Sequence, residues 1–469
     1  MSRINTNVSS LIAQKTLGRS NAQLQETLAR LSTGLRINSG KDDPAGLIAS
    51  ENLRRDITSA GKAISNTERA NQLIATADSA LSQISNLLND IRGLVIEAAN
   101  TGVLSDEQIA ANQLQVDSSL EAIDRIAQVT TFQGRKLLDG SLDFQFTYTA
   151  GGATVEDLNI DQANLGTAGS VAVDIQISAA ATQAQITNAA LPLADSLVVK
   201  ISGQKGSEVF TFELGATVTQ IVDAVNLVSD ATGVEATDNA GTLELDSVDY
   251  GSAAFVDVEV IEEGALGTFE AGLSATRVEG TDIVATVNGV TANGAGNTLS
   301  INTSTLDLSV TVSDGSAVAV GFTIDGGGAL FQLGPNVVSN QQARIGIRSV
   351  NTGVLGGVDG RLYELRSGNA ADLATDARTG TLIVDASINK ITSLRGRLGA
   401  FQRTTLETNI ASLSDTITNL TDAESSIRDA DFAAETARLT RAQILVQSGT
   451  AVLQIANSNP QNVLALLRG

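Results

Sequence analysis

Two stretches near opposite ends of the chain repeat apolar residues in alternating steps of four and three, and this repeat constrains the fold more than any other feature. Such spacing keeps one narrow apolar stripe on a helix, facing a partner helix as in a coiled coil. The repeat runs from Ala70 to Val95, from Ile391 to Phe401 and, after a slip of one residue, from Leu406 to Leu420. We predict an antiparallel coiled-coil rod built from both termini, with a seam that includes Ile74, Leu81, Ile84, Leu88, Ile91, Val95, Leu398, Ile410, Leu413 and Ile417.

Neighbouring segments predict further helices. A single helix over 44–100 would be about 85 Å long at the usual rise of ~1.5 Å per residue, which is far longer than a helix of a globular domain. Apolar residues indicate a second helix over 108–130. Near the C-terminus, a third seam is formed by Leu439, Ala442, Val446, Gly449, Leu453 and Ala456.

The stretch LSTGLRINSGKDDPAG interrupts the helical pattern near the N-terminus. Gly34 and Asn38 are residues that can end a helix. Asp42 or Asp43 can cap the next helix, and Pro44 suits its first turn because the N–H that proline lacks would be unbonded there. The break therefore predicts two helices in place of one.

Residues 1–40 thus become a separate short helix, which we expect to pair with 424–457. Both segments are rich in Ala and Ser and have too little apolar surface to form a stable domain alone. Ordering a chain costs roughly 1–2 kcal/mol per residue. We therefore expect both segments to be loose in a monomer and to become ordered when many copies stack.

Between about 141 and 340 the apolar period changes to two, which predicts β-strands. The run SLVVKISGQKGSEVFTFELG predicts a hairpin with Gly203 and Gly206 in its turn, and TVTQIVDAVNLVSD predicts a short helix. Asn-Gly pairs at Asn288 and Asn293 predict two further turns. The expected fold class is α+β and multidomain: a long helical rod with a β-rich insertion of small α+β modules in the middle.

The net charge of −22 is confined to the middle of the chain. Residues 141–343 contain 25 acidic and three basic residues, whereas the two ends together contain 27 of each. Neutral ends can pack against copies of themselves, and an acidic middle stays solvated and repels its copies. Nucleic acid is an unfavourable partner for such a chain.

The composition excludes several classes of catalytic and metal-binding site. The chain has no Cys and no His, so disulfides, Cys or His metal ligands, thiol nucleophiles and histidine acid–base catalysis are absent. We expect no enzyme, no metal and no cofactor. No stretch approaches the ~18 to 20 apolar residues of a membrane span, and the start lacks the pattern of a secretory signal peptide, so we expect either a cytoplasmic protein or export by another route.

Several runs of sequence resemble the bacterial flagellins: INTNVSSLIAQ, LSTGLRINSGKDDPAGLIAS, AIDRIAQVTTFQGRKLLDG, LGAFQRTTLETNIASL, AESSIRDADFAAETARLTRAQIL and SNPQNVLALLRG. They lie within residues 1–145 and 385–469, about half of the chain. The middle segment that begins TVTQIVDAVNLVSD resembles a β-rich insert of many flagellins, and FQLGPNVVSNQQARIGI resembles the strand that leads back into the rod.

The resemblance implies a non-enzymatic structural subunit that is secreted and polymerises into the extracellular flagellar filament used for motility. It divides the chain into an N-terminal helix of the inner filament core (1–40), rod helices (41–145), a surface-exposed β-rich insertion of two modules (146–335), return strands with the C-terminal rod helix (336–422) and a C-terminal helix of the inner core (423–469).

In this family the paired termini line the filament centre. The resemblance therefore implies that contacts between copies are made by Ile4, Val8, Leu11, Leu24, Leu28, Leu31, Val446, Leu453, Ile455, Leu464 and Leu467. It also implies a small export chaperone that binds 432–467, and the cap and junction proteins of the flagellum, as further partners.

Many flagellins activate a Toll-like innate immune receptor through a rod helix that resembles LLNDIRGLVIEAAN here. Arg92 and Leu94 match the receptor-active pattern. Asp90 stands in place of an arginine, Glu97 in place of a glutamine and, on the next helix, Gln115 in place of a glutamate. Because a reversed charge in an interface costs up to several kcal/mol, we expect weak or absent receptor activation.

Two other functions remain open at this point. A hook–filament junction protein shares the terminal helices of flagellins, and its abundance in sheared filaments would be low. A secreted adhesin or binding module would act through the β-rich middle alone and would not polymerise.

Overall fold

The computed structural model describes residues 6–166 and 168–466, with side chains of the last helix as far as residue 458. The chain forms two compact units, each built from segments distant in sequence. The first unit comprises residues 1–69, 333–337 and 403–469, and the second comprises 70–332 and 338–402.

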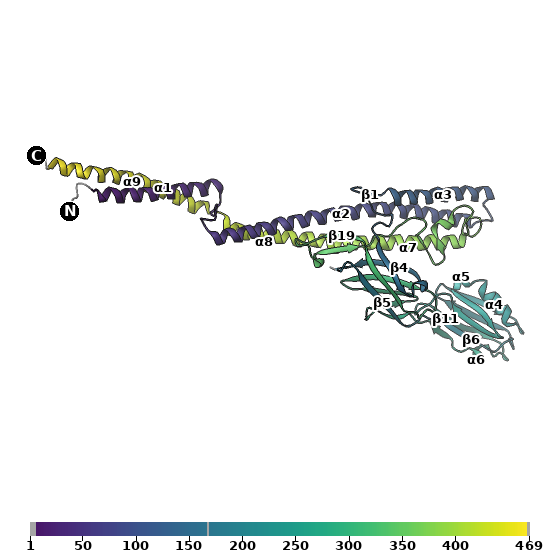
Figure 1. The fold of residues 1–469 in the computed structure, drawn as a ribbon. Coiled ribbons are helices and arrows are strands. Elements are labelled where there is room, and N and C mark those ends of the chain that lie inside the picture. Colours follow the sequence, from purple (N-terminus) through teal and green to yellow (C-terminus); the bar gives the residue numbers. More distant parts are fainter. Residues whose placement is uncertain (1–5, 167, 467–469) are drawn as a thin grey trace. The chain divides into compact units, whose positions relative to one another are not determined.

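The first unit consists of two antiparallel pairs of helices. Helix α1 (Val8–Thr33) lies beside α9 (Phe432–Leu466), as Figure 1 shows. The first part of α2 (Pro44–Ala98) packs on α8 (Thr408–Arg428), where Leu413 contacts Ala60 and Ala63. The predicted pairing of the two terminal segments is therefore present within one chain.

The second unit contains the remainder of α2 together with α3 (Asp106–Val129) and α7 (Ala377–Phe401). Ser105 caps α3 by accepting a hydrogen bond from the Gln108 N–H, and the Gln108 side chain accepts one from the Ser105 N–H, so the start of this helix is fixed locally. Helix α7 runs antiparallel to α2, because Asp78 of α2 pairs with Arg395 (2.8 Å) and Arg92 of α2 pairs with Asp385 (2.6 Å).

A π-helix, Gln402–Glu407, joins α7 to α8 at the one-residue slip in the C-terminal repeat. The i→i+5 hydrogen bonds of a π-helix accommodate one extra residue in a turn without a break in the backbone. Phe401 before the π-helix and Leu406 within it are therefore both buried despite their spacing of five.

The middle of the chain forms two antiparallel β modules. The first is a sandwich with sheet orders β14-β13-β5-β18-β3 and β15-β16-β17-β4-β20-β19 around one core. Its strands are β3 (Phe144–Ala150), β4 (Val155–Ala163), β5 (Val171–Ala179), β13 (Val284–Val287), β14 (Val290–Thr291), β15 (Asn293–Ala295), β16 (Thr298–Asn302), β17 (Leu306–Val312), β18 (Val320–Gly327), β19 (Ala329–Gln332) and β20 (Gln342–Ile345).

The second module has sheet orders β12-β11-β7-β8 and β6-β10-β9 and its own core, which includes the buried side of α4 (Val218–Asn226). Its other elements are β6 (Gln185–Asn188), β7 (Leu197–Gly203), β8 (Ser207–Phe212), α5 (Ser229–Thr232), β9 (Val234–Asn239), β10 (Thr242–Ser247), β11 (Phe255–Glu263), α6 (Phe269–Gly272) and β12 (Arg277–Glu279). Two small ribbons, β1 (Thr131–Phe132) with β2 (Arg135–Lys136) and β21 (Gly356–Gly357) with β22 (Gly360–Arg361), lie near the rod helices in the sequence.

Ion pairs connect the sandwich to α7. Asp157 of β4 pairs with Arg348 (3.1 Å) and with Lys390 (3.0 Å), and Asp161 pairs with Arg397. Burial opposes ionisation of Asp157, but the two cations together hold its pKa below the ordinary value. Burial lowers the pKa of Arg397 to about 10, so this side chain is still a cation at neutral pH.

The predicted fold class is confirmed: long helices from both ends of the chain pack together, and the middle of the sequence forms β-sheets. The hairpin β7–β8 closes with a hydrogen bond from the Gly203 N–H to the Gly206 carbonyl, and Asn288 adopts the positive φ of 49° that an Asn-Gly turn requires. The predicted turn at Asn293 is wrong, since Asn293–Ala295 is a strand. Gly294 is needed for another reason, because a Cβ there would lie 2.0 Å from the Ile283 carbonyl oxygen.

We expect deletion of Thr404 to leave the rod nearly as stable as the unaltered chain, whereas deletion of Ser393 should destabilise it. Removing Thr404 takes out the one residue that the π-helix accommodates, so Phe401 and Leu406 come to lie four positions apart in a continuous α-helix and the later seam residues keep their phase. Removing Ser393 from the regular part of α7 rotates Leu394 and Leu398 by about 100° relative to Ile391. Each buried leucine contributes about 1.5–3 kcal/mol, so the melting temperature followed by circular dichroism should fall by many degrees for this deletion alone, and an equal fall for the Thr404 deletion would contradict this account of the π-helix.

Candidate polymerisation surface

The two ends of α1 are defined by local hydrogen bonds. At its start, the Asn7 side chain accepts a hydrogen bond from the Ser10 N–H at 3.0 Å. At its end, Gly34 has a φ of 73°, which glycine adopts without strain, and its N–H donates to the Arg30 carbonyl. Of the two residues that the sequence offers as the end of this helix, Gly34 and Asn38, it is Gly34 that ends it.

Small side chains form the seam between α1 and α9. On α1 the seam positions are Ser10, Ala13, Leu17, Ser20, Leu24, Thr27 and Leu31, and on α9 they are Glu435, Leu439, Ala442, Val446, Gly449, Leu453 and Ala456. Glu435 and the small members other than Gly449 are buried, whereas Gly449, the leucines and the valine are half-buried. At Gly449 the two helices approach so closely that a Cβ would lie 3.2 Å from Cδ1 of Leu17.

Large apolar side chains of both helices lie outside this seam and are exposed. Among the residues predicted for polymerisation, Val8, Leu11, Leu28 and Ile455 are exposed by 47% to 64%. Leu24, Leu31, Val446 and Leu453 are half-buried in the seam. Ile4 and Leu467 lie outside the described residues, and the side chain of Leu464 is among those not described.

Four further large aliphatic residues that were not predicted for polymerisation are exposed on these helices. They are Ile12, Ile444, Leu445 and Val452, with exposed fractions between 45% and 62%. The signal that could have found them is the seam itself: the predicted seam of α9 already leaves three of them outside it, and Ile12 falls outside the seam of α1 once Ser and Thr are counted as helix-contact positions. Together with the exposed predicted residues, they define what we call the outer apolar face: Val8, Leu11, Ile12, Leu28, Ile444, Leu445, Val452 and Ile455.

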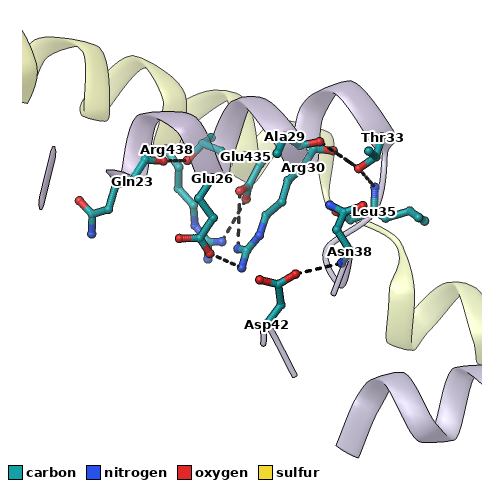
Figure 2. A network of polar contacts seen from close by, with 11 residues as sticks. Gln23, Glu26, Ala29, Arg30, Thr33, Leu35, Asn38, Asp42, Glu435 and Arg438 are labelled. Atoms are coloured by element: carbon teal, nitrogen blue, oxygen red, sulfur yellow. Dashed lines mark hydrogen bonds and ion pairs between the residues drawn. The ribbon is translucent and has the colours of Figure 1, made fainter. Parts of the chain in front are cut away.

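Polar contacts between α1 and α9 lie along the whole pair. At one end the Asn7 amide donates to the Ala456 carbonyl (2.7 Å), and the Ser10 hydroxyl donates to the Asn457 side chain (2.7 Å). At the other end Leu35 forms an isolated β-bridge with Asp429. Between them, the buried carboxylate of Glu435 pairs with Arg30 (3.7 Å) of α1 and Arg438 (3.0 Å) of its own helix, as Figure 2 shows.

The predicted break between the first two helices is held by two aspartates with separate tasks. Asp43 accepts a hydrogen bond from the Gly46 N–H and so caps α2, while Pro44 takes the first helical position. One oxygen of Asp42 accepts hydrogen bonds from the Ser39 and Asn38 N–H groups and from the Ser39 hydroxyl. These bonds hold the pKa of Asp42 below its ordinary value.

The residues predicted for the rod seam are placed as follows. Eight are buried, namely Ile74, Leu81, Ile84, Leu88, Ile91, Val95, Leu398 and Leu413, and two are half-buried, namely Ile410 and Ile417. This seam differs from that of α1 and α9 because its members are large and the chain buries them without any partner copy.

The predicted receptor region forms part of the surface of α2 and α3. Asp90, Glu97 and Gln115 are exposed, and Leu94 is half-buried. Arg92 is engaged by Asp385 through two hydrogen bonds, of 2.6 Å and 3.4 Å, which raise the pKa of the guanidinium.

Within residues 6–166 and 168–466, no three acidic side chains are grouped so that they could hold a metal ion. In the same described part, no helix combines the length and the apolar character needed to cross a bilayer.

Comparisons with known proteins match both ends and the middle of the chain. The family model of the bacterial flagellin N-terminal helical region matches residues 4–143, that of the C-terminal helical region matches 381–467, and the flagellin hook IN motif matches 198–249. The flagellin of Salmonella rubislaw is 31% identical over 515 residues, and the B-type flagellin of Pseudomonas aeruginosa is 31% identical over 525 residues, each with 99% of both chains covered. The solved structure of FliC from Burkholderia pseudomallei is 18% identical, with a TM-score of 0.27 over 71% of this chain and 98% of that chain.

We expect Asp42→Ala to loosen the segment that joins α1 to α2. The change removes the acceptor of the Asn38 and Ser39 amides, so their hydrogen-exchange protection factors at neutral pH should fall, whereas Lys41→Ala should leave them unchanged. In the unaltered chain the carboxylate contributes fully above its ordinary pKa of 3.8, and its contribution is lost as the pH falls through the lowered value of the folded state. Acid-induced loss of protection that is the same with and without Asp42 would show that another group controls this segment.

Proposed function

The chain belongs to the bacterial flagellin family, and we propose that it polymerises through the outer apolar face of α1 and α9. Flagellin is the non-enzymatic structural subunit of the extracellular filament used for motility, so function here consists of contacts between copies. The single observation that carries the proposal is the position of the large apolar side chains, which lie outside the α1–α9 seam and are exposed in a single chain.

The energetics of the pair favour this assignment. A seam of Ser, Ala, Thr and Gly buries little apolar area, whereas ordering the two helices costs roughly 1–2 kcal/mol per residue. Burying one exposed leucine or isoleucine against a neighbour returns about 1.5–3 kcal/mol. Ordering of the two helices is therefore favourable mainly where neighbouring copies are already in place, and this dependence keeps monomers soluble and the polymer stable.

We assign each segment of the chain a place in the filament from the same considerations of apolar exposure and charge. Residues 1–40 and 423–469 supply the inner core, 41–145 and 336–422 supply the rod around it, and 146–335 faces outward. The acidic balance of the middle supports this order, because like charge is least costly on the solvated exterior of a polymer.

We also propose an export chaperone as a partner of 432–467. The outer apolar face of α9 contains Ile444, Leu445, Val452 and Ile455, which a cytoplasmic partner would have to cover before export. Cap and junction proteins of the flagellum are expected to meet the same terminal helices.

Assembly should depend on the outer apolar face. We expect Leu11→Lys and Ile455→Lys each to slow growth on filament seeds at neutral pH by about tenfold or more, because a charge would have to be buried without a partner. Leu227→Lys is the matched control, since Leu227 is 82% exposed on the second β module and lies far from both termini in the sequence. Light scattering and electron micrographs give the readout, and a chain without 1–40 and 424–469 should not grow at all.

Growth of the two terminal variants at the rate of Leu227→Lys would overturn the proposed contact surface. Growth of the truncated chain into filaments would remove the termini from the mechanism altogether.

Receptor activation should be weak, and Asp90→Arg should raise it. Asp90 is exposed on α2 and presents a negative charge where the receptor-active pattern has a positive one. Reversing it should increase the response of a Toll-like receptor reporter cell line, because like-charge contacts at an interface cost up to several kcal/mol. Asp56→Arg, an equal change at an exposed site of the same helix, is the control. Full potency of the unaltered chain, or an equal gain from Asp56→Arg, would contradict this prediction.

A further inference from the structure

The apolar part of the α1–α9 seam does not specify how the two helices align. Its residues repeat every seven positions: Leu17, Leu24 and Leu31 on one helix, and Leu439, Val446 and Leu453 on the other. Each of these large residues lies opposite a small residue of the other helix, as Leu17 lies against Gly449, and sliding one helix by seven residues places large residues opposite small ones again. The apolar area buried in the slipped pair is therefore close to that of the native pair, and apolar packing alone discriminates poorly between them.

Glu435 breaks this repeat. It occupies the seam position seven residues before Ala442, and only 4% of it is exposed. One carboxylate oxygen faces Arg30 across the seam at 3.7 Å, and the other lies 3.0 Å from Arg438. Arg30 is held in place by Glu26 at 2.6 Å, one turn earlier on α1, as Figure 2 shows.

A slip of one repeat separates Glu435 from Arg30. In one direction it brings Glu435 to Gln23, which has no charge, and in the other to Ile37, beyond the end of α1 at Thr33. A buried carboxylate that loses a cation partner is strongly unfavourable, and a single buried polar residue is a known means of fixing the register of a coiled coil.

We propose that Glu435 selects the register in which α1 pairs with α9, with Arg30 as its cross-seam partner. It acts as a specificity-determining residue for assembly, and this role rests on the proposed function of the terminal helices. The partner that it selects is the α1 segment of the same chain. In the correct register the outer apolar face is presented in one fixed pattern to every neighbouring copy.

Other contacts between the helices provide a rival explanation. The hydrogen bonds of Asn7 and Ser10 at the far end, and the bridge of Leu35 with Asp429, would also be broken by a slip. Neutral hydrogen bonds contribute only about 0.5–1.5 kcal/mol each, so we assign the larger share of the selection to the buried charge.

Disulfide trapping in the full-length protein can test this assignment, because the chain has no cysteine of its own. A Cβ at Gly449 would lie 3.7 Å from the Leu17 Cβ, which suits a disulfide. Leu17→Cys with Gly449→Cys therefore reports the native register. Leu17→Cys with Ala442→Cys, or with Ala456→Cys, reports a slip of one repeat in either direction.

Each cysteine pair is placed in the unaltered chain, in Glu435→Leu and in two comparison variants, then grown on filament seeds and oxidised mildly. Glu26→Gln removes an equal charge from the same arginine but only within α1, and Asn7→Ala with Ser10→Ala removes the neutral contacts. We expect the ratio of slipped to native intrachain cross-links to rise about tenfold in Glu435→Leu, the ratio set by about 1.4 kcal/mol, and to stay unchanged in Glu26→Gln.

The inference is overturned if filaments form and Glu435→Leu keeps the native ratio, if Glu26→Gln raises the ratio equally, or if only the Asn7 and Ser10 variant slips. It is also overturned if Glu435→Leu gives neither cross-link, because Glu435 would then be required for pairing and not for its register. Absence of filaments from the unaltered chain and its cysteine pairs would instead count against the proposed function.

Discussion

The proposed mode of assembly depends first on the close contact of small residues between α1 and α9. Because Ala13, Ala442 and Gly449 bring the helix axes close together, the pair is held by few buried atoms. The large apolar residues that would stabilise an isolated helical hairpin are displaced to the outside. A seam of leucines alone would make the hairpin stable in the monomer and would leave its outer face polar. The weakness of the intrachain pair and the apolar character of its surface are therefore two consequences of one choice of seam residues.

The helices of the rod show the opposite arrangement, with large side chains inside the seam. Their seam residues, from Ile74 to Val95 on α2 and Ile391 to Leu398 on α7, are large and fully buried, and ion pairs such as Arg395 with Asp78 accompany them. A segment of this kind folds without neighbours and can present its terminal helices to a growing end. The π-helix at Gln402–Glu407 shows how the chain absorbs a residue that would otherwise put the seam out of phase. The β modules have cores of their own, and the sandwich contacts the rod through ion pairs such as that of Asp157 with Lys390.

The sequence predicted the helices, the break at Gly34 to Pro44 and the hairpin β7–β8, because each depends on residues close together in the chain. It predicted the slip after Phe401 but not the π-helix, since hydrogen-bond geometry has no sequence pattern of its own. Strand order could not be predicted, because β4 pairs with β17 across a long insertion and alternation does not identify partners. The α9 side of the seam was predicted, Gly449 included, but the α1 side was overlooked for a physical reason: a search for large apolar residues misses contacts made by Ser10, Ser20 and Thr27. Leu24 and Leu31 were consequently assigned to contacts between copies, whereas they are half-buried within one chain.

A polymer with many repeated contacts can be stable even when each contact is weak, but every copy must present its contact surface in the same geometry. If a copy joined the filament with α1 and α9 aligned one repeat away from the native register, its outer apolar face would be displaced by roughly 10 Å, seven residues at ~1.5 Å each. Every later contact on that copy would then be mismatched, and the defect would be retained in the filament. A buried carboxylate is an expensive way to stabilise a helix pair, and replacing it with an apolar residue of similar size often increases stability. Its presence in a seam that is otherwise weak is understandable if the alignment of the pair matters more to this protein than the strength of the pair.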